Sequence, residues 1–147
     1  MGDGAKSCWI KKHNGSRTTH WGEERDWSGL DSTSIKMIKM KEGHRTSFKF
    51  NKIKNEMFIC VTGKVKAYFG DELIVSKSEG NLQTHDLHPG DAIVVQSSCP
   101  YRLEALEDST LIEVASGKGE STRMHDDYGR EVDCSSKHID KLNKQWW

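Results

Sequence analysis

Residues 56–69 read EMFICVTGKVKAYF, and this stretch decides the fold. Positions 57–61 are all apolar, as in a strand that is covered on both of its faces. Positions 64–69 instead alternate, with their apolar side chains on one face, which is the two-residue period of a half-buried strand. Thr62 and Gly63 separate the two runs and mark a turn. The stretch therefore predicts two consecutive β-strands joined by a tight turn.

Short runs of the same kind continue on both sides of this pair. Residues with β-branched or aromatic side chains recur about every eight to twelve positions between 33 and 116, with Gly, Asn and Asp between the runs. Helical periodicity is almost absent before residue 117, so the pattern predicts an all-β antiparallel sandwich or barrel. The expected strands cover residues 33–41, 46–50, 56–62, 64–69, 72–78, 82–87, 92–95, 101–106 and 110–116.

Polar segments frame this β region at both ends of the chain. The 147 residues are the length of one domain with tails. We expect a flexible N-terminal arm over residues 1–20, a barrel over 21–131 and a tail over 132–147. Apolar residues at helical spacing within 135–147 predict a short C-terminal helix.

Charge and composition exclude several classes of partner. The chain carries 22 basic and 22 acidic residues, and this balance argues against binding to nucleic acid or to an anionic membrane. No apolar run approaches the roughly 20 residues that cross a membrane. Residues 1–12 contain no apolar stretch, so we expect no secretory signal, a cytoplasmic location and free cysteine thiols.

Five stretches resemble, in the same order, the cupin superfamily and within it the cupin domain of type II mannose-6-phosphate isomerases. Together they extend over about residues 19–131, and their order and spacing make the resemblance more specific than any one of them. The stretches are Trp21–Trp27, Ser34–Ser47, Glu56–Val65, Arg102–Val114 and the Asp-x-Tyr-Gly-Arg motif of Asp126–Arg130.

This resemblance implies a fold, an activity and an assembly. The implied fold is the double-stranded β-helix, a jelly-roll barrel with a pocket in its middle. The implied activity is the isomerisation of a sugar phosphate. The sequence has no guanylyltransferase domain, which is often fused to this cupin domain, so we expect no nucleotidyl transfer. Because cupins commonly dimerise, the resemblance also implies a homodimer.

The metal-binding positions of the family are mostly replaced in this sequence. The family uses histidine or glutamine, histidine, glutamate and a further histidine to hold a divalent ion. Here Lys49, Asn51, Glu56 and Tyr101 stand at those positions, so only the glutamate is retained. An ammonium group repels a metal cation. We therefore expect no metal and no other cofactor.

The same four positions leave alternatives for the chemistry of the barrel. Lys49 either pairs with Glu56 or takes the place of the metal and binds an anion such as a phosphate. Tyr101 either fills the barrel or donates a hydrogen bond and acts as an acid or base. The candidate catalytic residues are therefore Glu56, Tyr101 and Lys49.

Further ligand-binding candidates come from the resemblance. Arg45 matches a position that the family often fills with arginine, and it either reaches a phosphate or is a solvated turn residue. Tyr128 and Arg130 belong to the end motif, which in the family folds back near the pocket, either to bind ligand or as a structural clasp. With Lys49 and Asn51 they complete the predicted ligand-binding set.

Three functions remain open from the sequence. One is a sugar-phosphate isomerase that works through an enediol, with Glu56 or Tyr101 moving the proton. Another is a metal-free cupin that isomerises or epimerises a nucleotide-linked keto sugar. The last is a module that binds an anionic small molecule without turnover.

Overall fold

The computed structural model describes residues 4–72, 82–117 and 121–125, and these residues contain β-strands and no helix. For these residues the expected all-β fold class is confirmed. The described strands are β1 (Ser16–Thr18), β2 (Gly22–Trp27), β3 (Thr33–Met40), β4 (Phe48–Asn51), β5 (Asn55–Thr62), β6 (Val65–Phe69), β7 (Gln83–Leu87), β8 (Ala92–Val95), β9 (Tyr101–Ala105), β10 (Ser109–Ser116) and β11 (Ser121–His125).

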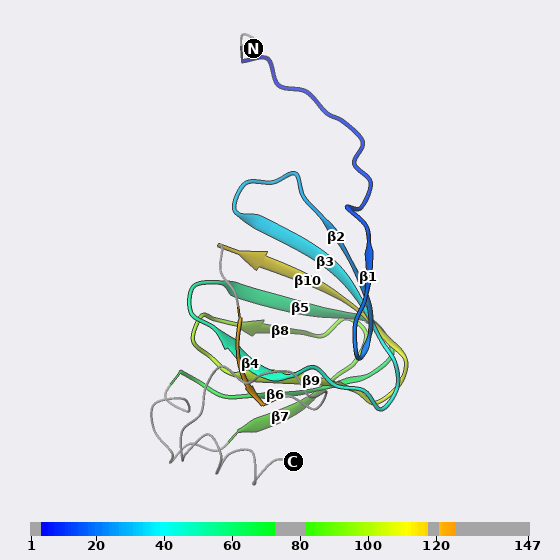
Figure 1. Ribbon diagram of the computed structural model, residues 1–147, viewed down its shortest axis with the longest axis vertical. Coiled ribbons are helices and arrows are strands. Elements are labelled where there is room, and N and C mark those ends of the chain that lie inside the picture. Colours follow the sequence, from blue (N-terminus) through cyan, green and yellow to red (C-terminus); the bar gives the residue numbers. More distant parts are fainter. Residues whose placement is uncertain (1–3, 73–81, 118–120, 126–147) are drawn as a thin grey trace.

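The strands form two antiparallel sheets that face each other, as in a jelly roll (Figure 1). One sheet has six strands in the order β1-β2-β3-β10-β5-β8, and the other has five in the order β11-β4-β9-β6-β7. Neighbours in each sheet are distant in sequence, since β10 pairs with both β3 and β5. The sheets are two walls around a common interior, not one continuous closed barrel.

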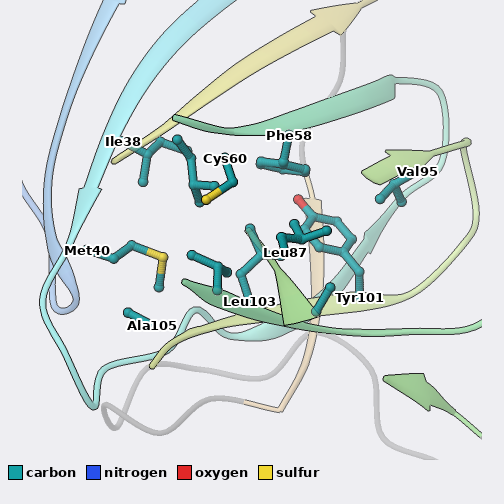
Figure 2. Close-up of a cluster of buried hydrophobic side chains, with 12 residues drawn as sticks. Ile38, Met40, Phe58, Cys60, Leu87, Val95, Tyr101, Leu103 and Ala105 are labelled. Carbon is teal, nitrogen blue, oxygen red and sulfur yellow. The ribbon is translucent and has the colours of Figure 1, made fainter. Parts of the chain in front are cut away.

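The space between the sheets holds the hydrophobic core (Figure 2). Ile38, Cys60 and Leu111 of the six-stranded sheet meet Leu103 and Ala105 of the other sheet in one buried cluster. The register explains why one layer of apolar residues forms, because Leu111 is paired with Ile38 on one side and with Cys60 on the other. Directly paired residues share one face of a sheet.

The turn between β5 and β6 requires glycine. Gly63 has φ +86°, in the left-handed region where side chains with a Cβ are strained. A Cβ at this position would also overlap the backbone oxygen of Asp108 and the side chain of Ser109. The tight turn that the sequence predicted at Thr62 and Gly63 is therefore fixed by backbone geometry, and it carries the chain from β5 of one sheet to β6 of the other.

Three strands were not predicted from the sequence. β2 carries four charged residues, and β1 and β11 lie in segments that lack strand-like apolar runs. β1 falls inside the segment expected to be a flexible arm, and it pairs with β2 at the edge of the sheet. The described residues ahead of β1 extend away from the two sheets (Figure 1). The strand expected over 72–78, the C-terminal helix and the tail over 132–147 lie wholly or almost wholly outside the described residues.

No helix among the described residues is long and apolar enough to cross a membrane.

Candidate functional site

Two carboxylates lie side by side on the inner face of the six-stranded sheet. The alternation of β10 turns Leu111, Glu113 and Ala115 inward. Since Ala115 pairs with Glu56, and Glu113 with Phe58, the two glutamates are diagonal neighbours on adjacent strands. Both are buried, with 7% of Glu56 and 6% of Glu113 exposed.

The five-stranded sheet places a lysine and a tyrosine close to these two carboxylates. Lys49 of β4 and Tyr101 of β9 are directly paired, and the Lys49 Nζ lies 5.9 Å from the centre of the Tyr101 ring. The Tyr101 hydroxyl points into the space between the sheets (Figure 2) and donates to both carboxylate oxygens of Glu56, each 3.2 Å away. Lys49, Glu56, Tyr101 and Glu113 thus form one group, which we call the interior cluster.

Glu56 titrates near neutrality within the interior cluster. Burial raises its pKa to about 7, and the charge of Glu113 and a hydrogen bond with Glu113 act in the same direction. Lys49 opposes this shift by attracting the ionised form. Ionisation of Glu56 would bury a negative charge beside Glu113, and both effects keep the proton on Glu56.

The pKa values of Lys49 and Tyr101 are also shifted. Burial lowers the pKa of Lys49, and the carboxylates of Glu113 and Glu56 oppose that change. Burial and the charge of Glu56 raise the pKa of Tyr101 well above its usual value, so its hydroxyl keeps its proton and donates. Among the described residues, Glu56 is engaged by Tyr101 and Glu113, and it forms no direct ion pair with Lys49 within 4.0 Å.

A cleft of about 620 Å³ opens beside Lys49, between the edge of the six-stranded sheet and β4. Three cations, Arg17, Lys36 and Lys49, line it together with a single carboxylate, that of Glu24. The lining therefore favours an anion. The other lining residues are Thr18, Thr19, His20, Trp21, Ser47 and Ser121.

Two of the three cations are held in place by carboxylates of β2. Arg17 Nε lies 3.0 Å from Glu24 Oε1, and Arg17 Nη1 lies 3.2 Å from Asp26 Oδ1. Lys36 Nζ lies 3.9 Å from Glu24 Oε2. Lys36 is also the direct cross-strand partner of Glu113, and the charges of Glu113 and Glu56 act on Lys49. Both lysines therefore connect the cleft to the interior cluster.

The structure brings together some of the residues predicted from the sequence. Glu56, Tyr101 and Lys49 lie in the interior cluster. Asn51 Oδ1 accepts hydrogen bonds from the backbone N–H groups of residues 53 and 54, at 3.1 and 2.8 Å, and so caps the turn before β5. Arg45 forms a β-bridge with Glu104 and is not among the cleft residues.

Tyr128 and Arg130 lie outside the described residues, so their predicted ligand-binding role stays a prediction.

The sequence analysis did not identify Glu113 or the charged cleft residues Arg17, Glu24 and Lys36 as site residues. Glu113 is an isolated charge between apolar neighbours, and it shares the alternation of Leu111 and Ala115, which was the available signal. Lys36 interrupts an apolar run in the same way. Arg17 and Glu24 gave no comparable signal, because β1 and β2 were not predicted as strands.

The donor groups do not fit the metal ion that the sequence resemblance implies. Lys49 places an ammonium where a ligand is needed, Asn51 Oδ1 is engaged by the backbone, and the Tyr101 hydroxyl donates to Glu56. Within the described ranges no three His, Cys, Asp or Glu side chains are grouped to hold a metal. The absence of a metal ion from this site stays a prediction.

Comparison with solved structures shows similarity in fold, at sequence identities too low to show a closer relationship. KdgF from a Halomonas species matches with a TM-score of 0.55 and 20% identity, over 65% of this chain and 80% of that one. A cupin superfamily protein from Desulfitobacterium hafniense matches with a TM-score of 0.53 and 13% identity, over 73% and 82%. A Bacillus subtilis oxalate decarboxylase variant matches with a TM-score of 0.64 and 17% identity, over 82% of this chain and 34% of that one.

No protein-family model matches the sequence, and no curated protein matches it. The structural likeness shows that the chain has the cupin fold.

Proposed function

We propose that the chain binds a small anionic molecule, a sugar phosphate, in the cleft and exchanges a proton with it without a metal ion. One observation carries the proposal: Lys49 lines the cleft, and its charge acts on Glu56, whose pKa is raised to about 7. The proposal agrees with the sequence resemblance to the sugar-phosphate isomerases and replaces the metal of that family with an ammonium group.

Charge and size support the binding part. The cleft volume of about 620 Å³ lies in the range of small-molecule sites. A phosphate monoester carries a charge of about −1.5 to −2 at neutral pH. Arg17, Lys36 and Lys49 offer it charge-assisted hydrogen bonds, which are about twice as strong as neutral ones.

Proton affinity supports the catalytic part. Aldose–ketose isomerisation moves a proton between two carbons beside a carbonyl group, and an acid or base works best when its pKa lies near the working pH. The pKa of Glu56, at about 7, meets this condition. Lys49 is placed to stabilise negative charge that develops on a substrate oxygen. Tyr101 keeps Glu56 oriented through its hydroxyl.

Binding is tested by thermal unfolding with hexose 6-phosphates, inorganic phosphate and the neutral hexoses. We expect the sugar phosphates to raise Tm by several degrees and the neutral sugars to have no effect. Lys49→Met should weaken binding at least about tenfold, because it removes one charge-assisted contact. Lys52→Met, which changes an exposed lysine outside the cleft, should leave binding unchanged. Equal stabilisation of the wild type and the Lys49→Met variant contradicts the proposal, as does a lack of stabilisation by any anion.

A binding module without turnover is the second candidate, because Glu56 and Tyr101 are buried and are not among the cleft residues. Solvent deuterium distinguishes the two. An isomerase exchanges the C2 hydrogen of a bound hexose 6-phosphate in D₂O, which NMR detects. Glu56→Gln should slow this exchange about 100-fold while the thermal shift by ligand persists. Binding without any exchange assigns the chain to the second candidate.

A further inference from the structure

The amine of Lys49 differs from the other two cations of the cleft in its contacts. Arg17 and Lys36 both pair with carboxylates of β2. Within the described ranges, Lys49 Nζ forms no hydrogen bond and no ion pair within 4.0 Å. It lies over the Tyr101 ring instead, 5.9 Å from the ring centre. The nitrogen of Lys49 is therefore open to a ligand in the cleft.

The surroundings of this amine favour its unprotonated form. Lys49 is half-buried and lines the cleft of about 620 Å³. Burial lowers its pKa, and the positive charge of Lys36 acts in the same direction. The carboxylates of Glu113, Glu56 and Glu24 oppose this change without reversing it. A lower pKa leaves more of the amine unprotonated at neutral pH, and an unprotonated lysine is a nucleophile.

A proton donor lies at the hydroxyl end of the same tyrosine. The Tyr101 ring contacts Lys49, and its hydroxyl lies 3.2 Å from each carboxylate oxygen of Glu56. Glu56 keeps a proton up to about neutral pH. A compound bonded to Lys49 therefore has an acid close to the bond that forms, which is the arrangement of a nucleophile with an adjacent acid or base.

We propose that Lys49 forms an imine with the carbonyl group of a phosphorylated open-chain sugar. The inference rests on the proposed function, since Arg17 and Lys36 hold the phosphate in the same cleft while Lys49 reaches the carbonyl carbon. It also goes beyond that function. Binding and charge stabilisation need only a cation at position 49, whereas an imine needs a primary amine there.

The step balances in atoms and charge. The lone pair of the unprotonated nitrogen forms a bond to the carbonyl carbon, and a proton passes from nitrogen to the former carbonyl oxygen. Glu56 then gives its proton to this hydroxyl group, which leaves as water while the nitrogen lone pair completes the C=N bond. The products are a protonated imine, a Glu56 carboxylate and one water molecule. The positive imine accepts the electron pair when a proton is removed from the neighbouring carbon.

Reductive trapping with fructose 6-phosphate and sodium cyanoborohydride tests the inference on the full chain. The reagent reduces an imine to a stable secondary amine, so the intact mass counts adducts and peptide mapping locates them. At neutral pH we expect a single adduct, on Lys49, that forms at least about tenfold faster than on any exposed lysine. Fructose, which lacks the phosphate, should show no preference for Lys49.

Lys49→Arg is the discriminating variant. A guanidinium group keeps the positive charge but stays protonated, so it cannot form the imine. Fructose 6-phosphate should still raise the Tm of this variant, and the adduct should be lost. Lys52→Met, which changes an exposed lysine outside the cleft, should give the same adduct as the wild type.

Each other outcome overturns the inference. An adduct on Lys36, an adduct spread over exposed lysines, or an undiminished yield in Lys49→Arg does so. If fructose 6-phosphate stabilises the wild type without modifying it, the imine is excluded and the proposed binding stands. With neither stabilisation nor adduct, both proposals fail. Circular dichroism checks the fold of Lys49→Arg, and the position of the wild-type adduct decides the matter if this variant does not fold.

Discussion

Neighbouring groups act on Glu56 in opposite directions. The Tyr101 hydroxyl and the Lys49 ammonium favour its anion, whereas burial and the adjacent Glu113 favour its protonated form. The second influence is larger, so the pKa rises from 4.5 to about 7. A single carboxyl group therefore makes the interior sensitive to pH in the physiological range.

Glu56→Gln should remove one pH dependence of stability. Because the folded pKa of Glu56 is raised, its favourable contribution is complete below about pH 4.5 and is lost as the pH rises through about 7. Relative to the wild type, Glu56→Gln should therefore gain unfolding free energy between pH 5 and pH 8, on the order of 2 kcal/mol. Urea unfolding at several pH values measures the difference.

Glu107→Gln is the control for this comparison. Glu107 is exposed, so its replacement should shift the unfolding free energy little at any pH. A Glu56→Gln profile that runs parallel to the wild type between pH 5 and pH 8 contradicts the raised pKa.

The sequence predicted Glu56, Lys49 and Tyr101 as neighbours because each stands at a position of a known motif. The motif could not predict Glu113 as a site residue, because Glu113 reaches Glu56 through a diagonal contact between β5 and β10. These strands are separated by more than 45 positions, and no local pattern reports their register. Asn51 was placed in the ligand set by the same motif, and the structure gives it a turn-capping contact.

At the level of elements, the turn that links β5 of one sheet to β6 of the other depends on the glycine between them. Gly63 and Gly43 both have positive φ, at +86° and +82°, but only Gly63 has neighbours where a Cβ would lie. Alanine substitutions at the two glycines therefore distinguish the energetic cost of backbone strain from the cost of steric overlap.

Gly63→Ala should cost more than Gly43→Ala. Strain alone predicts a loss of about 1 kcal/mol of unfolding free energy for Gly43→Ala. Overlap with the Asp108 carbonyl adds to this for Gly63→Ala, so we expect a loss of 3 kcal/mol or more. The urea midpoints of the two variants measure the difference. Equal losses would mean that the backbone of β10 yields easily to the added methyl group.

The strands with apolar periodicity were predicted to within a few residues, and β1 and β2 were not. On β2, Glu24 lines the cleft and Asp26 pairs with Arg17, so this side of the strand is charged and its pattern does not resemble a core strand. β1 has only three residues and takes its structure from pairing with β2. Periodicity reports burial in an apolar core, and it fails where the inner face of a sheet is built from ion pairs.

At the level of the whole molecule, the N-terminal region divides into two parts with different roles. Residues 4–14 are exposed, whereas β1 supplies Arg17 to the cleft. Asn14 marks the boundary, because its backbone N–H donates to the Asp26 carbonyl at 2.8 Å.

Two truncations should therefore behave differently. Removal of residues 1–12 should change Tm by less than about 2 °C, because no strand pairing or cleft residue is lost. Removal of residues 1–20 should lower Tm by about 4 °C or more and abolish most of the thermal shift by sugar phosphates, since β1 and Arg17 are gone. Scanning calorimetry of both proteins with and without ligand measures the effects. If the protein that lacks residues 1–12 showed no shift of Tm with sugar phosphates, the first twelve residues would contribute to ligand binding, contrary to this prediction.

The proton that Glu56 holds near neutral pH has a calorimetric consequence. Any anion that docks beside Lys49 makes the loss of that proton harder, so complex formation near neutral pH draws hydrogen ions from the surrounding buffer. The apparent heat of association then includes the ionisation heat of whichever buffer supplies them. Titrations in Bis-Tris and in Tris, two buffers without an anion that competes for the cleft, would report different enthalpies for the same event. The difference between them would count the hydrogen ions absorbed.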